Sequence, residues 1–346
     1  MFKKFLYIIV ITFVLFLSVG LFLPRQVHVE RSIEIDRPAF TVFILLNSYR
    51  TFASWSPWAA RDPDAHYEFS GPESGVGARL SWSGDPRLVG SGWQEIIESR
   101  PYSLIRTRLD FDQQGVAESY FQLDEADSGV RVTWGFDTDL TEGQGFLGGY
   151  LAKYFGLLFD KWIGTDYEQG LAGLKIFAES LPDSDFSLLD AEVIDVEALD
   201  ILYVPNGSSQ DSGAIADTLS AAYREISAFM AANEIKMNGQ PMAISRAWEA
   251  EGYEFDAAIP VVMKPVELSG RVRAGQSPSG PSVRVVHKGP YDRMAPSYEK
   301  LAAYMAAHGL SEGQVSWEHY ISDPGETPED ELITHIYFAI GSDDEN

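Results

Sequence analysis

The 346-residue sequence contains no cysteine, so disulfide bonds, thiolate metal ligands and thiol nucleophiles are excluded. Basic residues are scarce, with 26 lysines and arginines against 51 aspartates and glutamates and a net charge of -25. Because contacts to phosphate require a basic surface, this balance argues against a nucleic-acid-binding protein. Hydrophobic residues make up 45% and charged residues 22% of the sequence, which is typical of globular domains. The length suffices for about two domains.

The motifs of common metal and catalytic sites are missing as well. The six histidines show no His-x-His or HExxH spacing, and the sequence has no G-x-S-x-G element. We therefore predict no metal ion and no cofactor. Whether the protein is an enzyme stays open at this stage.

One long uncharged run stands near the N-terminus. It extends over the 19 residues from Phe5 to Leu23 and follows Lys3 and Lys4. A helix of this length spans about 28 Å, close to the hydrocarbon thickness of a bilayer, and the leading lysines favour a cytoplasmic N-terminus. We predict a single-pass anchor over residues 1–26 in the cytoplasmic (inner) membrane, with the rest of the chain extracytoplasmic, or periplasmic. The alternative is a cleaved signal peptide.

An acidic, serine-rich segment, residues 179–190, divides the remaining chain and is predicted to be a linker. Residues 27–178 before it contain several runs in which apolar and polar residues alternate, which predicts an antiparallel sheet covered on one face. Residues 145–178 are predicted to form the covering helix. Their apolar residues recur at intervals of three or four: Leu147, Leu151, Phe155, Leu158 and Trp162.

This order of strand, short helices, antiparallel sheet and long closing helix resembles the START-like SRPBCC superfamily, of the polyketide cyclase/dehydrase type. The resemblance rests on IDRPAFTVFILLNSYRTFASWSPW, Gly75-Val76-Gly77, GSGWQEI and DYEQGLAGLK. It implies a helix-grip fold with a hydrophobic cavity between the sheet and the long helix. Members of this superfamily include lipid carriers, ligand sensors and cyclases, so the resemblance does not choose among these functions.

The final segment, residues 191–346, contains an internal repeat. Residues 219–233 align with residues 295–308 at a constant offset of 75, so that Tyr223 matches Tyr298. Strand-like segments flank both copies, which predicts a β-α-β-β order for each half. Two such halves predict a sheet with pseudo-twofold symmetry, with helices on one face and a concave groove on the other.

The repeat resembles the gyrase-inhibitor-like (GyrI-like) domain, also known as the effector-binding domain of AraC-type and multidrug-sensing regulators. The resemblance rests on HKGPY at 287–291, the helix SYEKLAAYM, WEHY at 317–320 and the strand 336–340. It implies a groove that binds small lipophilic or cationic molecules, with Glu318 facing the ligand. Some relatives hydrolyse small reactive molecules with the same glutamate. The regulators' basic helix-turn-helix is missing, so no role in transcription is expected.

The predicted fold class is thus α+β, comprising an N-terminal transmembrane helix, a helix-grip START-like domain and a duplicated β-α-β-β domain. Strand alternation places Glu318 and Tyr320 on one face, and the repeat and the last strand add Asp256 and Tyr337. We predict that these four residues line an aromatic groove with a negative floor, which suits an organic cation. The alternative is that the acids are solvated surface residues.

These patterns predict a membrane-anchored protein that binds a small hydrophobic or cationic ligand, without a DNA-binding domain. The alternative function is that of a hydrolase or cyclase acting on a small hydrophobic molecule, with Glu318 as general base and Tyr320 or Tyr337 as proton donor. A protein-interaction module is the third hypothesis, which the predicted location disfavours. No protein partner is identified.

Overall fold

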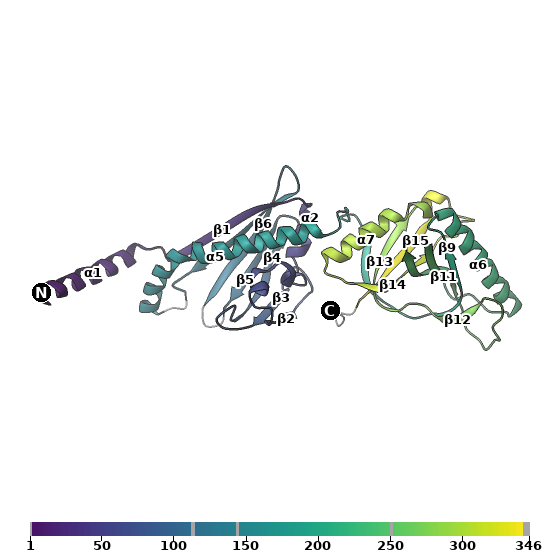
Figure 1. Cartoon of the computed structure of the whole chain (residues 1–346), viewed down its shortest axis with the longest axis horizontal. Coiled ribbons are helices and arrows are strands. Elements are labelled where there is room, and N and C mark those ends of the chain that lie inside the picture. Colours follow the sequence, from purple (N-terminus) through teal and green to yellow (C-terminus); the bar gives the residue numbers. More distant parts are fainter. Residues whose placement is uncertain (1, 112–114, 143–144, 250–251, 342–346) are drawn as a thin grey trace. The chain divides into compact units, whose positions relative to one another are not determined.

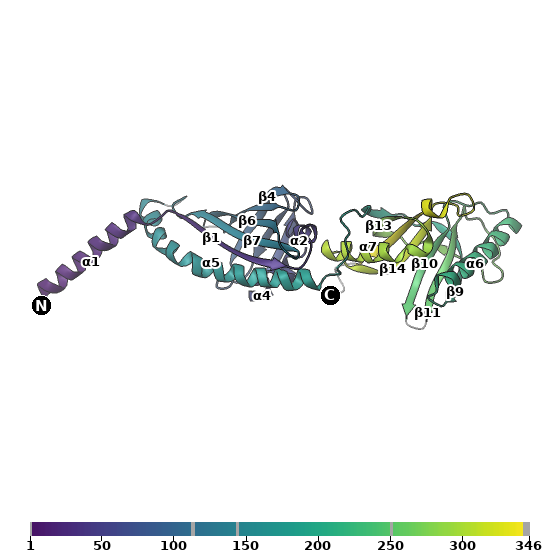
Figure 2. The same cartoon turned by 90° about the horizontal axis from the view of Figure 1, so that it is seen from above.

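The computed structural model describes residues 2–111, 115–142, 145–249 and 252–341, except for the side chains of residues 2–4, 6, 8–10 and 13. The chain divides into two compact units, Met1–Asp183 and Ser184–Asn346. Each unit contains its own antiparallel sheet with helices packed on it (Figures 1 and 2). The α+β architecture therefore agrees with the prediction.

Seven strands form the sheet of the first unit, in the order β1-β7-β6-β5-β4-β3-β2. The strands are β1 Gln26–Ile35, β2 His66–Ser70, β3 Arg79–Ser83, β4 Ser91–Arg100, β5 Leu104–Asp110, β6 Val116–Glu125 and β7 Val130–Asp139. The helices are α1 Phe2–Phe22, α2 Ala39–Leu46, α3 Phe52–Trp55, α4 Pro57–Arg61 and α5 Phe146–Ser180. Helix α5 runs along the sheet (Figure 1), so the predicted closing helix is present.

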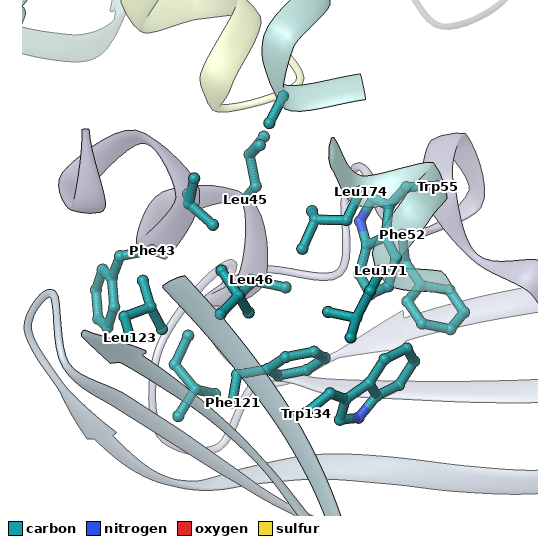
Figure 3. Close-up of a cluster of buried hydrophobic side chains, with 14 of the residues drawn as sticks. Phe43, Leu45, Leu46, Phe52, Trp55, Phe121, Leu123, Trp134, Leu171 and Leu174 are labelled. Carbon is teal, nitrogen blue, oxygen red and sulfur yellow. The ribbon is translucent and has the colours of Figure 1, made fainter. Parts of the chain in front are cut away.

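The C-terminal half of α5 makes the close contact with the sheet. Tyr167 stacks on Trp134 of β7 with 3.9 Å between the ring centroids. A Cβ atom at Gly170 would lie 2.6 Å from the Trp134 ring, so this glycine allows the helix to approach. Leu171 and Leu174 then pack beside Phe52 and Trp134 in the core (Figure 3).

The prediction that a stripe of five apolar residues packs this helix on the sheet is wrong. Its five members, which all lie in the N-terminal half, are 42–74% exposed. Apart from Gly149, the buried residues of α5 begin only at Gly164. The helix is buried where glycines permit close packing, which a count of apolar residues does not detect. The stripe residues are Leu147, Leu151, Phe155, Leu158 and Trp162.

The second unit contains an eight-stranded sheet in the order β12-β9-β11-β10-β14-β15-β13-β8. The strands are β8 Ala191–Val196, β9 Asp200–Ser208, β10 Met242–Glu249, β11 Gly252–Pro260, β12 Arg273–Gln276, β13 Gly280–Lys288, β14 Glu312–Tyr320 and β15 Ile333–Ile340. The helices are α6 Ser212–Ala232, α7 Ala295–Ala307 and the short 3₁₀ turns η2 Tyr291–Arg293 and η3 Glu329–Glu331. The six central strands thus comprise β9-β11-β10 followed by β14-β15-β13, two β-α-β-β halves in mirrored order.

The centre of this sheet lies between Ala243 and Glu318. These residues occupy equivalent places in the two halves, because they are 75 residues apart, and they are also direct cross-strand partners on β10 and β14. Their neighbours pair symmetrically, Met242 with His319 and Ile244 with Trp317. The pseudo-twofold axis therefore passes between an alanine and a glutamate.

The predicted membrane anchor is wrong. In the part of the chain that the structure describes, no helix has the length and apolar character needed to cross a bilayer. This finding contradicts the single-pass anchor over residues 1–26. The predicted extracytoplasmic location depended on that anchor and is contradicted with it.

The packing of α5 yields a test of the first unit. Leu174 is fully buried, whereas Ile176 on the same helix is 73% exposed. We expect Leu174→Ala to lower the free energy of unfolding by about 2–5 kcal/mol, because it removes buried methyl groups and leaves a cavity. Ile176→Ala is the matched control and should change stability by less than about 0.5 kcal/mol. Urea unfolding followed by tryptophan fluorescence measures both, and equal effects would contradict this packing.

Candidate functional site

Glu318 interrupts a row of apolar side chains beneath α6 and α7. The cross-strand register joins one residue from each of the six central strands into this row: Val204, Ala257, Ala243, Glu318, Ile336 and Val285. The first three belong to the cluster under α6, and the last two belong to the cluster under α7. Since partners in register share a face, Glu318 faces the helices, at the junction of the two halves.

Two tyrosine hydroxyls donate hydrogen bonds to the Glu318 carboxylate. The Tyr298 hydroxyl of α7 donates to Oε1, and the Tyr320 hydroxyl donates to Oε2 at 2.5 Å. The Glu318 side chain is buried, with the residue only 9% exposed. Among the described residues, no lysine or arginine forms an ion pair with it. Among the described residues, the carboxylate therefore has hydrogen-bond donors but no ion-pair partner, although the charge of nearby His287 lowers its pKa.

Three further tyrosines surround this carboxylate. Tyr291 of η2 and Tyr223 of α6 both approach the Tyr320 ring edge-on, with centroids 5.3 and 6.4 Å away. Tyr253 of β11 is close enough for the charge of Glu318 to raise the pKa of its hydroxyl. We call these residues the tyrosine cage: Tyr223, Tyr253, Tyr291, Tyr298 and Tyr320.

Burial dominates the electrostatics of the cage. It raises the pKa of Glu318 above the usual 4.5, although the hydrogen bonds from Tyr298 and Tyr320 oppose that shift. Burial and the neighbouring carboxylate raise the pKa of Tyr253 to about 12, and raise the pKa values of Tyr298 and Tyr320 well above 10. At neutral pH the tyrosines therefore keep their protons and act as donors to the carboxylate.

The structure divides the four residues predicted to line one groove. Glu318 and Tyr320 lie on the helix-covered face, whereas Tyr337 pairs with Trp317 on the opposite face and stacks on it at 4.9 Å. Asp256 pairs with Ile244, which pairs with Trp317, so it lies on that opposite face too. The candidate site around Glu318 thus lies beneath the helices, and the four residues do not share one face of the sheet as predicted.

Asp256 also differs from Glu318 in its partner. Its carboxylate is buried, and its Oδ2 lies 2.6 Å from an Arg246 guanidinium nitrogen. This ion pair neutralises the charge. Asp256 therefore has an ion-pair partner, which Glu318 lacks among the described residues.

Sequence reasoning overlooked four members of the cage as site residues. In the sequence, Tyr223 and Tyr298 stand out only as matching positions of the internal repeat. This match places one tyrosine from each helix over the central strands. Tyr291 belongs to the HKGPY motif. Tyr253 gave no signal beyond strand alternation.

A second candidate site is a cavity of about 420 Å³ in the first unit. It lies between the sheet and α5, and its walls are mainly apolar, with many aromatic side chains. Among the residues that line it are Trp58, Trp82, Phe111, Phe155, Phe159 and Tyr167. A volume of this size lies within the range of small-molecule pockets.

Two family matches agree with this division. Residues 26–179 match the family described as "Polyketide cyclase / dehydrase and lipid transport", and residues 204–340 match the "GyrI-like small molecule binding domain". The chain joins a polyketide cyclase/dehydrase-type domain to a GyrI-like domain. The predicted resemblances are thereby confirmed, and both descriptions point to small-molecule ligands. The tyrosine cage belongs to the GyrI-like domain, and the cavity belongs to the polyketide cyclase/dehydrase-type domain.

Several solved structures resemble parts of the chain. A hydrolase from Listeria innocua is 13% identical, with 44% of this chain and 91% of the other covered and a TM-score of 0.34. The C-terminal domain of EcmrR is 16% identical, with 45% and 99% covered and a TM-score of 0.41. The di-domain ARO/CYC StfQ from the steffimycin biosynthetic pathway is 12% identical, with 44% and 51% covered and a TM-score of 0.33.

No curated protein sequence matches the chain.

The burial of Glu318 makes the stability of the GyrI-like domain depend on pH. Because the folded state raises the pKa of this acid, it binds the proton more tightly than the unfolded chain does. Stability should therefore fall as the pH rises from about 4.5 through the raised pKa. We expect Glu318→Gln to remove this loss and to raise the melting temperature at pH 7. Glu254→Gln, at an exposed position on β11, is the control. Calorimetry between pH 4 and 8 tests both, and a destabilised Glu318→Gln at pH 7 would contradict the prediction.

Proposed function

We propose that the protein binds a small lipophilic cation at Glu318, inside the tyrosine cage of its GyrI-like domain. The observation that supports this most directly is a buried carboxylate that forms no ion pair among the described residues, although the charge of His287 lowers its pKa. A buried charge is costly unless something compensates it, and hydrogen bonds from Tyr298 and Tyr320 compensate it only in part. A bound cation would supply the missing charge.

The aromatic rings around Glu318 support the same ligand class. Tyrosine faces attract cations, most strongly where water is excluded, and they also accept apolar groups. The cage combines five such rings with one carboxylate. An inorganic ion would leave the rings without contacts, and a neutral hydrocarbon would leave the charge unpaired. A cation with an apolar surface satisfies both.

Tetraphenylphosphonium serves as a probe of this proposal, with triphenylphosphine oxide as the uncharged comparison. We expect the cation to bind and Glu318→Gln to weaken its binding on the order of tenfold to a hundredfold, because the substitution removes the Coulomb attraction between the carboxylate and the phosphonium charge in a buried site. Isothermal titration calorimetry on the full chain measures the affinity. Equal affinity of the two probes, or an unchanged affinity after Glu318→Gln, would refute the proposal.

Asp256→Asn is the matched control, because it removes the same charge from the opposite face of the same sheet. The structure predicts less than a twofold change in tetraphenylphosphonium affinity for this variant. A loss as large as that of Glu318→Gln would instead favour the groove predicted from sequence.

The pH dependence of binding tests the role of the tyrosine hydroxyls. Only ionised Glu318 attracts a cation, so the affinity should fall as the pH drops through its raised pKa. Tyr298→Phe removes a hydrogen bond that lowers this pKa, and should move the midpoint of the loss to higher pH. Tyr223→Phe should leave the midpoint in place, because the Tyr223 hydroxyl donates to the Met242 carbonyl oxygen at 2.8 Å. Measurements of the affinity between pH 5 and 8 give the midpoint for each variant. An equal shift of the midpoint in both variants would contradict this role of the Tyr298 hydroxyl.

A further inference from the structure

The N-terminal half of α5 exposes its apolar stripe. The five residues of the stripe, from Leu147 to Trp162, are 42–74% exposed, whereas Leu174 in the C-terminal half of the same helix is fully buried. Helix α1 packs beside the stripe, with Phe16 stacked on Tyr154 at 4.3 Å between the ring centroids, and leaves it open. A contiguous exposed apolar surface of this kind marks an interaction site. Within the described residues, the domain itself does not cover this surface.

Close packing on another side of the helix keeps the stripe turned outward. Gly149 is buried, and a Cβ atom at Gly156 would lie 2.5 Å from the Leu140 side chain, so the helix backbone rests directly on the domain there. Since a helix turns by about 100° per residue, these two glycines share one face, and Leu151 and Leu158 lie roughly opposite to them. Turning the stripe inward would break this contact. The stripe is therefore available to a partner outside the domain.

The charge of this half of α5 suits a second copy of the same chain. Residues 146–162 contain two lysines, Lys153 and Lys161, and one acid, Asp160, so the segment carries a net charge of +1 in a chain whose net charge is -25. Two copies of so acidic a chain repel each other at long range. They meet less repulsion through this segment than through the acidic remainder of the chain. The charge distribution therefore favours contact through the stripe.

The stripe has the area and the spacing that a pair of helices needs. A large apolar side chain offers on the order of 200 Å² to a partner, so the five exposed fractions leave on the order of 500 Å² open on one copy. A standard interface buries about 800 Å² on each partner, of which a polar rim supplies part. From Leu151 to Trp162 the stripe residues follow at intervals of four, three and four, the alternation with which paired helices interlock their side chains.

We propose that two copies of the protein form a twofold-symmetric dimer in which the stripes of their α5 helices pack on each other. A closed twofold contact requires a self-complementary surface, and an apolar stripe is complementary to itself. The twofold axis places the middle of the stripe, at Phe155, next to the same residue of the other copy. Phe155 also lines the cavity of about 420 Å³, so the dimer contact borders that cavity. This dimer does not depend on the function proposed for Glu318.

The absence of cysteine makes a cross-linking test direct, because an introduced thiol is the only one in each chain. Phe155→Cys in the full chain should give a covalent dimer with bismaleimidoethane, which joins two nearby thiols. Ile176→Cys, at a position that is 73% exposed on the C-terminal half of α5, is the matched control and should stay monomeric on denaturing electrophoresis. Equal cross-linking of the two variants, or none in Phe155→Cys, would overturn the proposal.

Sedimentation equilibrium of the full chain tests the same contact without a cross-linker. Replacing Leu151 and Leu158 together by glutamine should raise the dissociation constant of the dimer on the order of tenfold or more, because the dimer would bury amides without partners. Both leucines are exposed in one copy, so urea unfolding should show unchanged stability. Ile176→Gln, and Ile11→Gln at an exposed position of α1, should leave the dimer intact.

Three results of these measurements would overturn the proposal. The first is a wild-type chain that sediments only as a monomer. The second is a dimer that Ile11→Gln dissociates as strongly as the double variant does, which would place the contact on α1. The third is a monomer that cosediments with phosphatidylcholine vesicles and loses this binding in the double variant, which would make lipid the partner of the stripe.

Discussion

A single buried carboxylate constrains the second domain of this protein. Glu318 lies in an apolar row beneath two helices, where an ionised group loses its hydration and gains only partial compensation from tyrosine hydroxyls. Five tyrosines from five elements surround it, and burial keeps their hydroxyls protonated. An arrangement that costs stability in the absence of a ligand is common where a protein binds charged molecules, because the ligand supplies the missing interaction.

The duplicated fold explains how one such charge is tolerated. Ala243 and Glu318 are equivalent positions of the two halves, and they face each other across the pseudo-twofold axis. Two glutamates there would place like charges on directly opposed positions of neighbouring strands, which is unfavourable. The alanine avoids this repulsion. The symmetry of the backbone is therefore kept, whereas the carboxylate belongs to only one of the two halves.

The two domains present different chemistry to small molecules. The GyrI-like domain places a charge inside an aromatic cage, whereas the polyketide cyclase/dehydrase-type domain encloses a mostly apolar cavity with the neutral amide of Gln94 in its wall. The buried polar group is thus charged in one domain and neutral in the other.

The sequence by itself determined the two-domain organisation and the repeat with its offset of 75. It also determined that Glu318 and Tyr320 lie on the same face of their strand, because side chains alternate along a strand. Only the tertiary structure decided which residues of neighbouring strands lie on the same face of the sheet. The register that pairs Glu318 with Ile336 sends Tyr337 to the opposite face, and a shift of one residue would have reversed this. Alternation along one strand cannot reveal its register against the next. For the same reason the buried part of α5 was misjudged, since close packing depends on glycines opposite Trp134 rather than on the number of apolar residues.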